Sequence, residues 1–364
     1  MRIREITNYL ESLAPLGSQE SYDNAGLICG DKNTLVTNAL ISLDCTEEII
    51  EEAIEKGCNL VISHHPIVFK GLKTFTGKNY VERTIIKAIK HGISIYAIHT
   101  NLDHYKFGVN YKIGELLKVK HPKILSPTQN NLNKVIVYAP LSHSQKITES
   151  MFEAGAGQIG NYSECGFSSE GIGSYKADSN ASPFLGKINN RHQENELKIE
   201  VLVSSHKLSQ VISSMLTNHP YEEVAYDIIP LHNKNQYEGA GMIGELETEV
   251  DTLDFLKQLK TTFNCYIIRY TNIHKTKIKK IAWCGGAGSF LLQQAKQQNA
   301  DIFITGDFKY HEFFDAENQI IIADIGHFES EQFTIDLIGE LLSKKFTKFA
   351  PCLTGINTNP VKYF

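Results

Sequence analysis

Apolar and polar residues alternate along the first third of the chain in a pattern that predicts strands and helices in turn. Apolar residues at helical spacing predict an amphipathic helix over residues 3–13. Further elements are expected as strands at 39–43, 60–62 and 94–98, and as helices at 46–56 and 80–91. Thr46 is expected to cap the first of these helices and Gly92 to end the second. The alternation predicts a helix-covered, largely parallel sheet, that is, a three-layer αβα arrangement.

The same alternation returns in the last third of the chain. Helices are expected at 252–263, 290–298, 308–316 and 328–344, and strands at 280–284, 301–305 and 320–323. The two segments together are interpreted as one discontinuous α/β domain, residues 1–128 plus 234–364. A chain of 364 residues is long for a single core and suits two domains of ordinary size.

The middle of the chain, residues 129–233, has a different order of expected strands and helices. Strands are expected at 134–139, 197–203 and 224–229, and helices at 144–154 and 208–217. The Gly-, Ser- and Asn-rich stretch 155–195 suggests loops and a hairpin. Turn-rich stretches at 121–131 and 233–241 flank this region. Its β-α-β…β-α-β order predicts a ferredoxin-like α+β domain inserted into the α/β domain.

Composition narrows the class of protein. A hydrophobic content of 42% is that of a soluble globular protein, and a net charge of −5 offers no basic field for nucleic acid or an anionic membrane. The seven cysteines are scattered and never spaced as C-x-x-C, which disfavours a zinc ribbon or a disulfide framework. The charged N-terminus is not a signal peptide, and no apolar stretch approaches the roughly 20 residues that span a bilayer. A cytoplasmic location is therefore expected.

Three segments far apart in the sequence place histidine and carboxylate just beyond an apolar, strand-like run. They follow the expected strands at 60–62, 94–98 and 320–323. The side chains are those of His64, His65, His99, Asp103, His327 and Glu331. Because side chains at the carboxyl ends of neighbouring parallel strands converge on one crevice, these groups are expected to form a metal site. Each segment alone has a plainer explanation, such as a structural histidine, a helix cap or a solvated helix face.

The spacing within each segment suggests how metal ions would be shared. Adjacent side chains on a strand diverge, so one ion cannot easily take both His64 and His65, whereas two neighbouring ions could take one each. His327 and Glu331 are four residues apart at the start of a helix and share one face of it. Glu331 could bridge two ions with its two oxygens.

The remaining segment offers an oxygen ligand and a group for proton transfer. Asp103 can supply a hard oxygen, and His99 is the candidate for proton transfer or for orienting a ligand. His104 is expected to be exposed. Nitrogen and oxygen ligands without thiolate suit Zn, Mn, Fe(II), Co or Ni. Two such ions roughly 3.5–4 Å apart could activate a water molecule for attack.

Two glycine-rich segments need separate interpretations. Residues 155–160 match G-x-G-x-x-G but follow a predicted helix rather than a strand, so we reject a dinucleotide fingerprint. Residues 285–289 lie between a strand and a helix, where the N–H groups near Gly286 and Gly288 could hold a phosphate. A tight structural turn explains this segment equally well.

Polar loops supply further candidates for contact with a substrate. Asn24, Asp307 and His311 lie in loops beside apolar runs and are expected to line the same crevice. Turn chemistry explains the segment that follows Asn24 just as well.

Six motifs in this order resemble one family, the Ngg-interacting-factor-three-like proteins, often labelled GTP cyclohydrolase I type 2. The motifs are DNAGL (23–27), SHHP (63–66), HTNLD (99–103), CGGAGS (284–289), TGDFKYH (305–311) and GHFESE (326–331). The resemblance covers both pieces of the α/β domain. The segment HPYEEVAYD (219–227) resembles the CutA/PII-like insert of the longer members.

The resemblance implies a dinuclear metal centre, with two divalent ions and zinc as the first choice over Mn, Fe, Co or Ni. The positions that match the family's ligands are His64, His65, Asp103, His327 and Glu331. It also implies a ring-shaped homo-hexamer with trimeric contacts through the insert.

Two classes of function follow from this resemblance. The first is a metal-dependent hydrolase that acts on a nucleotide or another small molecule. With GTP, activated water would attack C8 of the purine, His99 would transfer a proton, and formate would leave. The alternative is a non-catalytic metal-binding or regulatory assembly whose insert senses a ligand. A nucleic-acid-associated ring is disfavoured by the acidic net charge.

Overall fold

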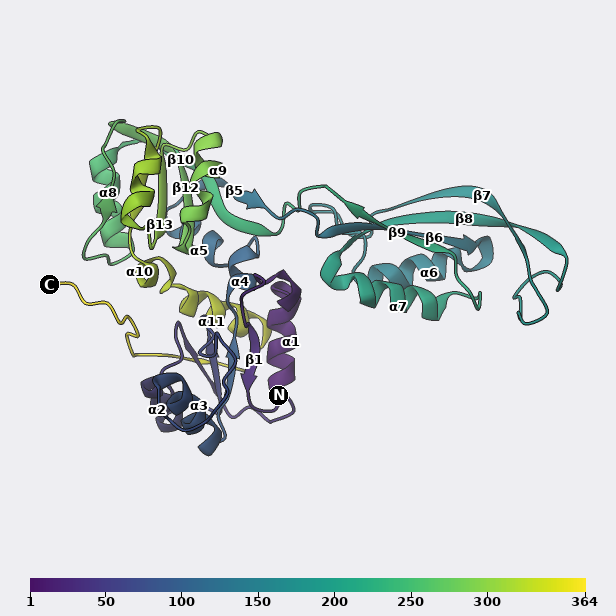
Figure 1. The fold of residues 1–364 in the computed structure, drawn as a ribbon, viewed down its shortest axis with the longest axis horizontal. Helices are drawn as coiled ribbons and strands as arrows, with labels where there is room; N and C mark the ends of the chain where they lie inside the picture. Colours follow the sequence, from purple (N-terminus) through teal and green to yellow (C-terminus); the bar gives the residue numbers. More distant parts are fainter. The chain divides into compact units, whose positions relative to one another are not determined.

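The computed structural model describes residues 1–364, and their contacts divide them into two compact units. The first unit consists of Met1–Pro127 together with Tyr237–Phe364, and the second of Thr128–Gln236. The sequence places the insert at residues 129–233. Figure 1 shows the elements of both units coloured along the chain.

The first unit contains a five-stranded, mostly parallel sheet. Its order is β1 (Gly26–Cys29), β4 (Ser94–Ala97), β3 (Leu60–Ser63), β2 (Ala39–Ser42) and β15 (Cys352–Leu353). Only β1, at one edge, runs antiparallel to its neighbour. Helices α2 (Glu47–Glu55) and α3 (Tyr80–Lys90) pack on one face, and α1 (Ile3–Leu13) packs on the other. Because both faces are covered, β2, β3 and β4 are buried throughout.

A second sheet in the same unit has six strands of mixed direction. Its order is β11 (Arg269–Tyr270), β14 (Ile321–Asp324), β13 (Ile302–Gly306), β12 (Lys277–Ala287), β10 (Gly239–Asp251) and β5 (Lys120–Pro127). Only β12, β13 and β14 are mutually parallel. The expectation of one largely parallel sheet is therefore wrong. One hydrophobic cluster contains buried residues of both sheets and joins them, and each sheet has a further cluster on its other face.

The strands that sequence patterning missed explain this error. Residues 121–131 and 233–241 were expected to be loops, yet β5 and β10 begin in or cross these stretches and pair with each other. The first half of β5 is mostly exposed, so it lacks the apolar run by which a buried strand is recognised. Its pairing depends on β10, which is distant in the sequence, rather than on a local pattern.

The helices of the first unit follow the predicted pattern with three differences. The remaining ones are α4 (Thr100–His104), α5 (Val109–Leu116), α8 (Thr252–Thr262), α9 (Leu292–Gln297), α10 (His327–Glu331) and α11 (Thr334–Lys345). The helix expected at 328–344 is divided into α10 and α11. The helix expected at 308–316 is a 3-10 helix, Tyr310–Ala316. Helices α4 and α5 were not predicted. Thr46 caps α2 as expected, since its hydroxyl accepts the N–H of Ile49.

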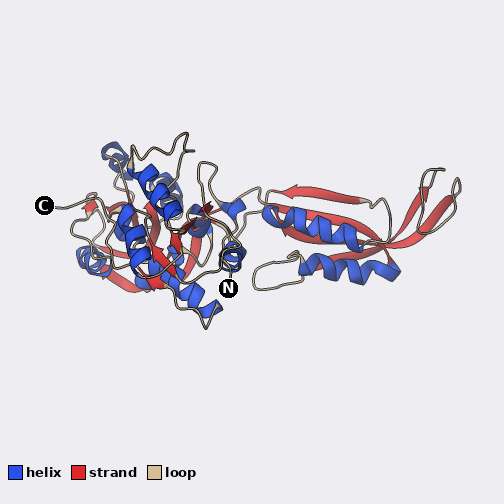
Figure 2. Ribbon diagram, turned by 90° about the horizontal axis from the view of Figure 1, so that it is seen from below, coloured by secondary structure: helices blue, strands red, loops and turns tan.

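The second unit is a four-stranded antiparallel sheet with two helices. Its elements are β6 (Leu132–Pro140), α6 (Leu141–Glu153), β7 (Gly166–Lys176), β8 (Arg191–Ser204), α7 (Leu208–Asn218) and β9 (Tyr226–Leu231). The strand order is β7-β8-β6-β9, and α6 and α7 pack on one face of the sheet (Figure 2). A hairpin was expected within residues 155–195, and β7 and β8 form one. The bounds of β7 were not predicted, because this strand is exposed almost throughout. No helix in either unit is long and apolar enough to cross a membrane.

Candidate metal centre

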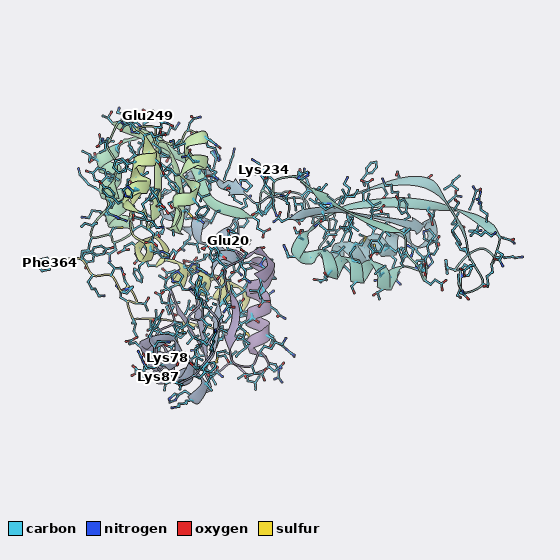
Figure 3. The ribbon with its side chains drawn as sticks, in the orientation of Figure 1. Glu20, Lys78, Lys87, Lys234, Glu249 and Phe364 are labelled. Carbon is cyan, nitrogen blue, oxygen red and sulfur yellow. The ribbon has the colours of Figure 1, made fainter.

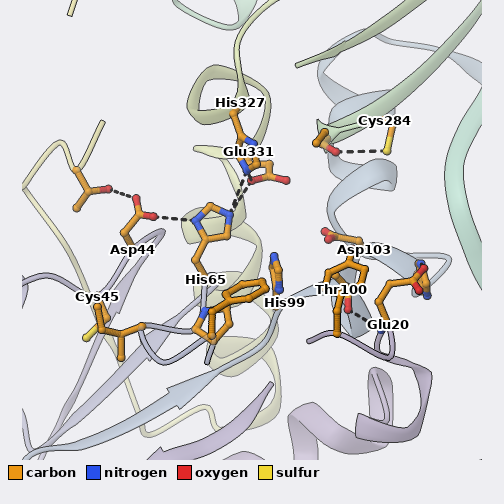
Figure 4. Close-up of a pocket in the computed structure, with 18 of the residues that line it drawn as sticks. Glu20, Asp44, Cys45, His65, His99, Thr100, Asp103, Cys284, His327 and Glu331 are labelled. Atoms are coloured by element: carbon orange, nitrogen blue, oxygen red, sulfur yellow. Dashed lines mark hydrogen bonds and ion pairs between the residues drawn. The ribbon is translucent and has the colours of Figure 1, made fainter. Parts of the chain in front are cut away.

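The six strand-end side chains meet in the first unit. His64 and His65 follow β3, whereas His99 and Asp103 follow β4 and lie at the start and near the end of α4. His327 and Glu331 are the first and last residues of α10, which follows β14 of the other sheet. The site therefore lies where the ends of two sheets face each other, and not in the crevice of a single sheet as expected. Figure 4 shows the side chains converging from both sides.

Three groups of side chains bring possible ligand atoms within 4.8 Å of one another. The groups are His64 with His65 and His99, His65 with His327 and Glu331, and His64 with Asp103 and Glu331. His64 and His65 were expected to diverge, but their ring centroids are only 4.9 Å apart. This difference arises because the strand β3 ends at Ser63, so the alternation of side chains no longer applies to the two residues that follow.

Glu331 occupies the centre of the cluster and is 3% exposed. Its Oε2 lies 3.0 Å from Nε2 of both His65 and His327, while its Oε1 lies 3.9 Å from Nε2 of His64. The two carboxylate oxygens thus face different imidazoles. Gly286 makes room for this carboxylate, because a Cβ at that position would lie 2.3 Å from Oε1.

Each of four imidazoles has its Nδ1 held by an oxygen behind it. The pairs are His64 with the Ile98 carbonyl (2.8 Å), His65 with Asp44 (2.7 Å), His99 with Asp23 (2.8 Å) and His327 with Asp307 (2.7 Å). An Nδ1–H bonded in this way fixes the tautomer and leaves Nε2 as a free ligand or base. This arrangement is the usual environment of metal-binding histidine.

Sequence reasoning did not assign Asp23 or Asp44 this role. Asp44 stands just beyond β2, so the strand-end rule that selected His64 could also have found it. Asp23 lies in the DNAGL segment, but nothing local pairs it with His99, which is 76 residues away. Asp307 was predicted to contact substrate, and the structure places its carboxylate behind His327.

Two buried polar atoms in the cluster lack a hydrogen-bond partner. They are Nε2 of His64, whose side chain is fully buried, and Oδ1 of Asp103, and they lie 3.6 Å apart. Buried polar atoms are nearly always satisfied, so such a pair needs an explanation. A cation between them would satisfy both, because nitrogen and oxygen atoms that bind one ion at about 2.1 Å lie roughly 3–3.5 Å from each other. The buried groups therefore fit a divalent metal ion.

The cluster strongly shifts the pKa values of its members. Burial lowers the pKa of His64 to about 4. Burial also opposes the protonation of His65, but contacts with Asp44 and Glu331 dominate and raise its pKa to about 9. Carboxylate contacts likewise outweigh burial at His327 and raise its pKa to about 11. Burial and the charge of Glu331 raise the pKa of Asp103.

These shifts predict that metal binding releases protons. At pH 7 the metal-free chain holds a proton on both His65 and His327, and a metal ligand must be a neutral imidazole. An imidazole with a raised pKa keeps its proton below that pKa, so metal affinity should rise with pH up to about 9 for His65 and on towards about 11 for His327. Calorimetry of metal binding in buffers of different ionisation enthalpy should show that both imidazoles release a proton. A heat of binding that does not depend on the buffer would contradict this expectation.

A cavity of about 820 Å³ opens onto the cluster. Its lining combines His65, His99 and Glu331 with the aromatic side chains of Tyr22, Phe69, Tyr80 and Phe290. The rings of Tyr22 and Phe69 are stacked, with centroids 6.4 Å apart. No lysine or arginine lines the cavity. Glu20, which is labelled in Figure 3, also lies in the lining.

The other predicted contact residues have varied surroundings. Asn24 is exposed and donates to the Val68 carbonyl, and His311 is exposed beside Tyr310 and Phe314; neither lines the cavity. His104 was expected to be exposed, but its side chain is 15% exposed and lies in the lining, because its Nδ1 bonds to the Ser18 carbonyl.

The glycine-rich segment 285–289 makes its own internal contacts. The N–H of Gly285 donates to Asn110 and that of Gly286 to Ser330, each at 2.9 Å. A Cβ at Gly288 would lie 2.5 Å from the hydroxyl of Thr305. A phosphate at Gly285 or Gly286 would have to displace these protein acceptors.

Comparison with known proteins identifies the class to which this chain belongs. The sequence matches the Duf34/NIF3 (NGG1p interacting factor 3) family over residues 1–360. A Halalkalibacterium halodurans protein named GTP cyclohydrolase 1 type 2 homolog is 38% identical over 324 residues, covering 88% of this chain and 87% of that protein. A Staphylococcus epidermidis protein of the same name is 34% identical over 368 residues, with full coverage of both. The chain belongs to the Duf34/NIF3 family.

Solved structures agree with this assignment. A Bacillus cereus protein related to NIF3 has a TM-score of 0.84 and 35% identity, covering 100% of this chain and 99% of that one. A Staphylococcus aureus protein has a TM-score of 0.79 and 32% identity with the same coverage. The fold seen here, with its two sheets and its second unit, is therefore shared by relatives of similar length.

Proposed function

We propose that this chain is a metal-dependent hydrolase whose site holds two divalent ions, with zinc as the first choice. The observation that supports two ions is the position of Glu331, which is shared by two groups of possible ligands. One group adds His65 and His327, and the other adds His64 and Asp103. Each oxygen of Glu331 faces one group, as expected of a bridging carboxylate.

Bound divalent ions would lower the pKa of a water molecule and so provide a nucleophile at neutral pH. His99 would accept or return the proton at Nε2, because its Nδ1 is bonded to Asp23. Asp23 suits this part as a permanent anion: burial opposes its ionisation, but hydrogen bonds from His99 and Thr100 dominate and lower its pKa to about 2. The hydrogen bond to Asp23 thereby fixes the orientation of the imidazole.

We propose a nucleotide as the first substrate class to test, since relatives are named as homologues of GTP cyclohydrolase 1 type 2. Tyr22 and Phe69 could stack on a purine ring in the cavity. A triphosphate would find no lysine or arginine there. Phosphates would then have to contact the ions or remain outside the cavity, so guanosine and GMP should be tested beside GTP.

The test is formate release by the metal-loaded full chain. Addition of water at C8 opens the imidazole ring to a formamide, and a second water hydrolyses the formamide to give one formate per turnover. Formate dehydrogenase detects the formate, and mass spectrometry identifies the ring-opened product. Release above that of the double variant His64→Ala, Glu331→Ala would support the proposal. A different result would be a chain that binds metal but releases no formate from GTP, GMP or guanosine and turns over no compound in a wider panel of hydrolase substrates. That result would instead support a non-catalytic metal-binding assembly.

A further inference from the structure

The second unit has a cavity of its own, of about 820 Å³, which the proposed hydrolase does not use. It lies among the distal part of the β7–β8 hairpin, the segment that follows β7, the end of β6, and residues 221–225. All its lining residues belong to Thr128–Gln236. Its volume is within the range usual for small-molecule sites.

A buried carboxylate, that of Glu196 on β8, lines this cavity. Glu196 is only 9% exposed, and its Oε1 accepts a hydrogen bond from the Tyr221 hydroxyl at 2.8 Å. Strand β7 leaves space beside it, because a Cβ at Gly173 would lie 2.0 Å from its Oε2. Four residues further along the same strand, Glu200 forms ion pairs with both Lys134 and Lys198, whereas no ion pair is formed by Glu196.

The nearby imidazole does not supply the missing charge. His219 is 8% exposed, and its Nε2 donates to the Tyr138 carbonyl at 3.0 Å. Its Nδ1 accepts the N–H of Tyr221 at 3.2 Å, so the ring is neutral. Burial also lowers the pKa of His219. Glu196 is therefore a buried carboxylate without a cationic partner, a situation that proteins usually avoid.

Aromatic rings stand beside this carboxylate. The Tyr221 ring lies 6.3 Å from that of Tyr175 and 6.2 Å from that of Phe184, centroid to centroid. The Tyr175 hydroxyl donates to the Leu185 carbonyl at 2.6 Å, which ties the segment after β7 to the strand. Rings of this kind attract a cation through their negative faces and also offer apolar surface.

The other charged residues of the lining are mostly acidic. Asp178, Glu222 and Glu223 join Glu196 in the lining, and Lys176 is its one basic residue. Four carboxylates against one lysine repel an anionic ligand and favour a cationic one.

We propose that this cavity binds an organic cation, an ammonium or guanidinium compound with an apolar body. Its charged group would pair with Glu196, and its body would pack on Tyr175, Phe184 and Tyr221. A bound cation would supply the counter-charge that the chain itself does not give to Glu196.

Calorimetry on the full chain tests this proposal with benzylamine and agmatine as probes. Benzyl alcohol is the neutral control of matched shape. We expect both cations to bind and benzyl alcohol to bind at least tenfold more weakly. Glu196→Gln should weaken the binding of both cations at least tenfold, and Glu200→Gln, the same change on the same strand outside the cavity, should leave it unchanged.

A second variant keeps the test decisive if Glu196→Gln does not fold. Phe184→Leu preserves apolar volume but removes an aromatic face, so it should weaken benzylamine binding several-fold. Equal binding of benzylamine and benzyl alcohol, or no binding of either cation at millimolar concentration, would overturn the proposal. A change in oligomeric mass on Glu196→Gln without any change in cation affinity would also overturn it and would assign the cavity to contact between copies.

Discussion

Replacing Glu331 with glutamine is expected to abolish metal binding almost completely. Glu331, His64 and His65 each belong to two of the three ligand groups, and Glu331 is the only carboxylate among these three. Its oxygens face His64 on one side and His65 and His327 on the other. A neutral amide removes the charge and one acceptor from the centre of the cluster. Removal of a residue that only hydrogen-bonds to a metal ligand already lowers metal affinity about 10–100-fold. Loss of the Glu331 carboxylate, a ligand itself, should therefore lower the affinity more than roughly 100-fold.

Elemental analysis of the purified variant, followed by metal titration, measures this effect. Glu329→Gln is a matched control: it lies on the same short helix and is 5% exposed, but it bonds to Asn359 instead of the imidazoles. The control should retain the metal content of the unaltered chain. If Glu331→Gln retained the same metal content as Glu329→Gln and the unaltered chain, Glu331 would not be a ligand.

Replacing His99 with glutamine is expected to remove activity while leaving metal in place. The ring of His99 lies 5.3 Å from the rings of both His64 and His65, so it borders the cluster from which an activated water would react. Loss of a general acid or base usually costs about 10²–10⁴-fold in turnover. Asp23→Asn should have a smaller effect in the same direction, because it disturbs the tautomer of His99 without removing the ring.

Turnover and metal content should be measured on the same preparations, with the substrate that the formate assay or the hydrolase panel identifies. His91→Gln serves as control: His91 is exposed at the C-terminal cap of α3 and precedes β4, whereas His99 follows this strand. If His99→Gln loses metal in parallel with activity, His99 is a ligand, as its group with His64 and His65 would permit. If neither quantity changes, His99 has no part in the reaction.

The elements that a local pattern encodes could be predicted well. The buried strands β2, β3 and β4 are short apolar runs, and α2 carries its own cap at Thr46. By contrast, β7 has almost no buried residue, and β5 is largely exposed along its first half. Such strands exist because a partner strand satisfies their backbone hydrogen bonds, and a single sequence does not show which partner that is.

The sequence by itself determined which residues gather at the candidate metal centre. Strand-end position and i, i+4 spacing are local properties, and they selected His64, His65, His99, Asp103, His327 and Glu331 without reference to the rest of the chain. Only the tertiary structure decided that two sheets supply these groups and that Asp23, Asp44 and Asp307 stand behind three of the imidazoles. It also decided that Glu196 lies in a second cavity without an ion pair. These features join residues as far apart as His65 and Glu331, which are separated by 266 positions. Contacts over such separations depend on the packing of whole elements, and packing is a property of the folded chain rather than of any local segment.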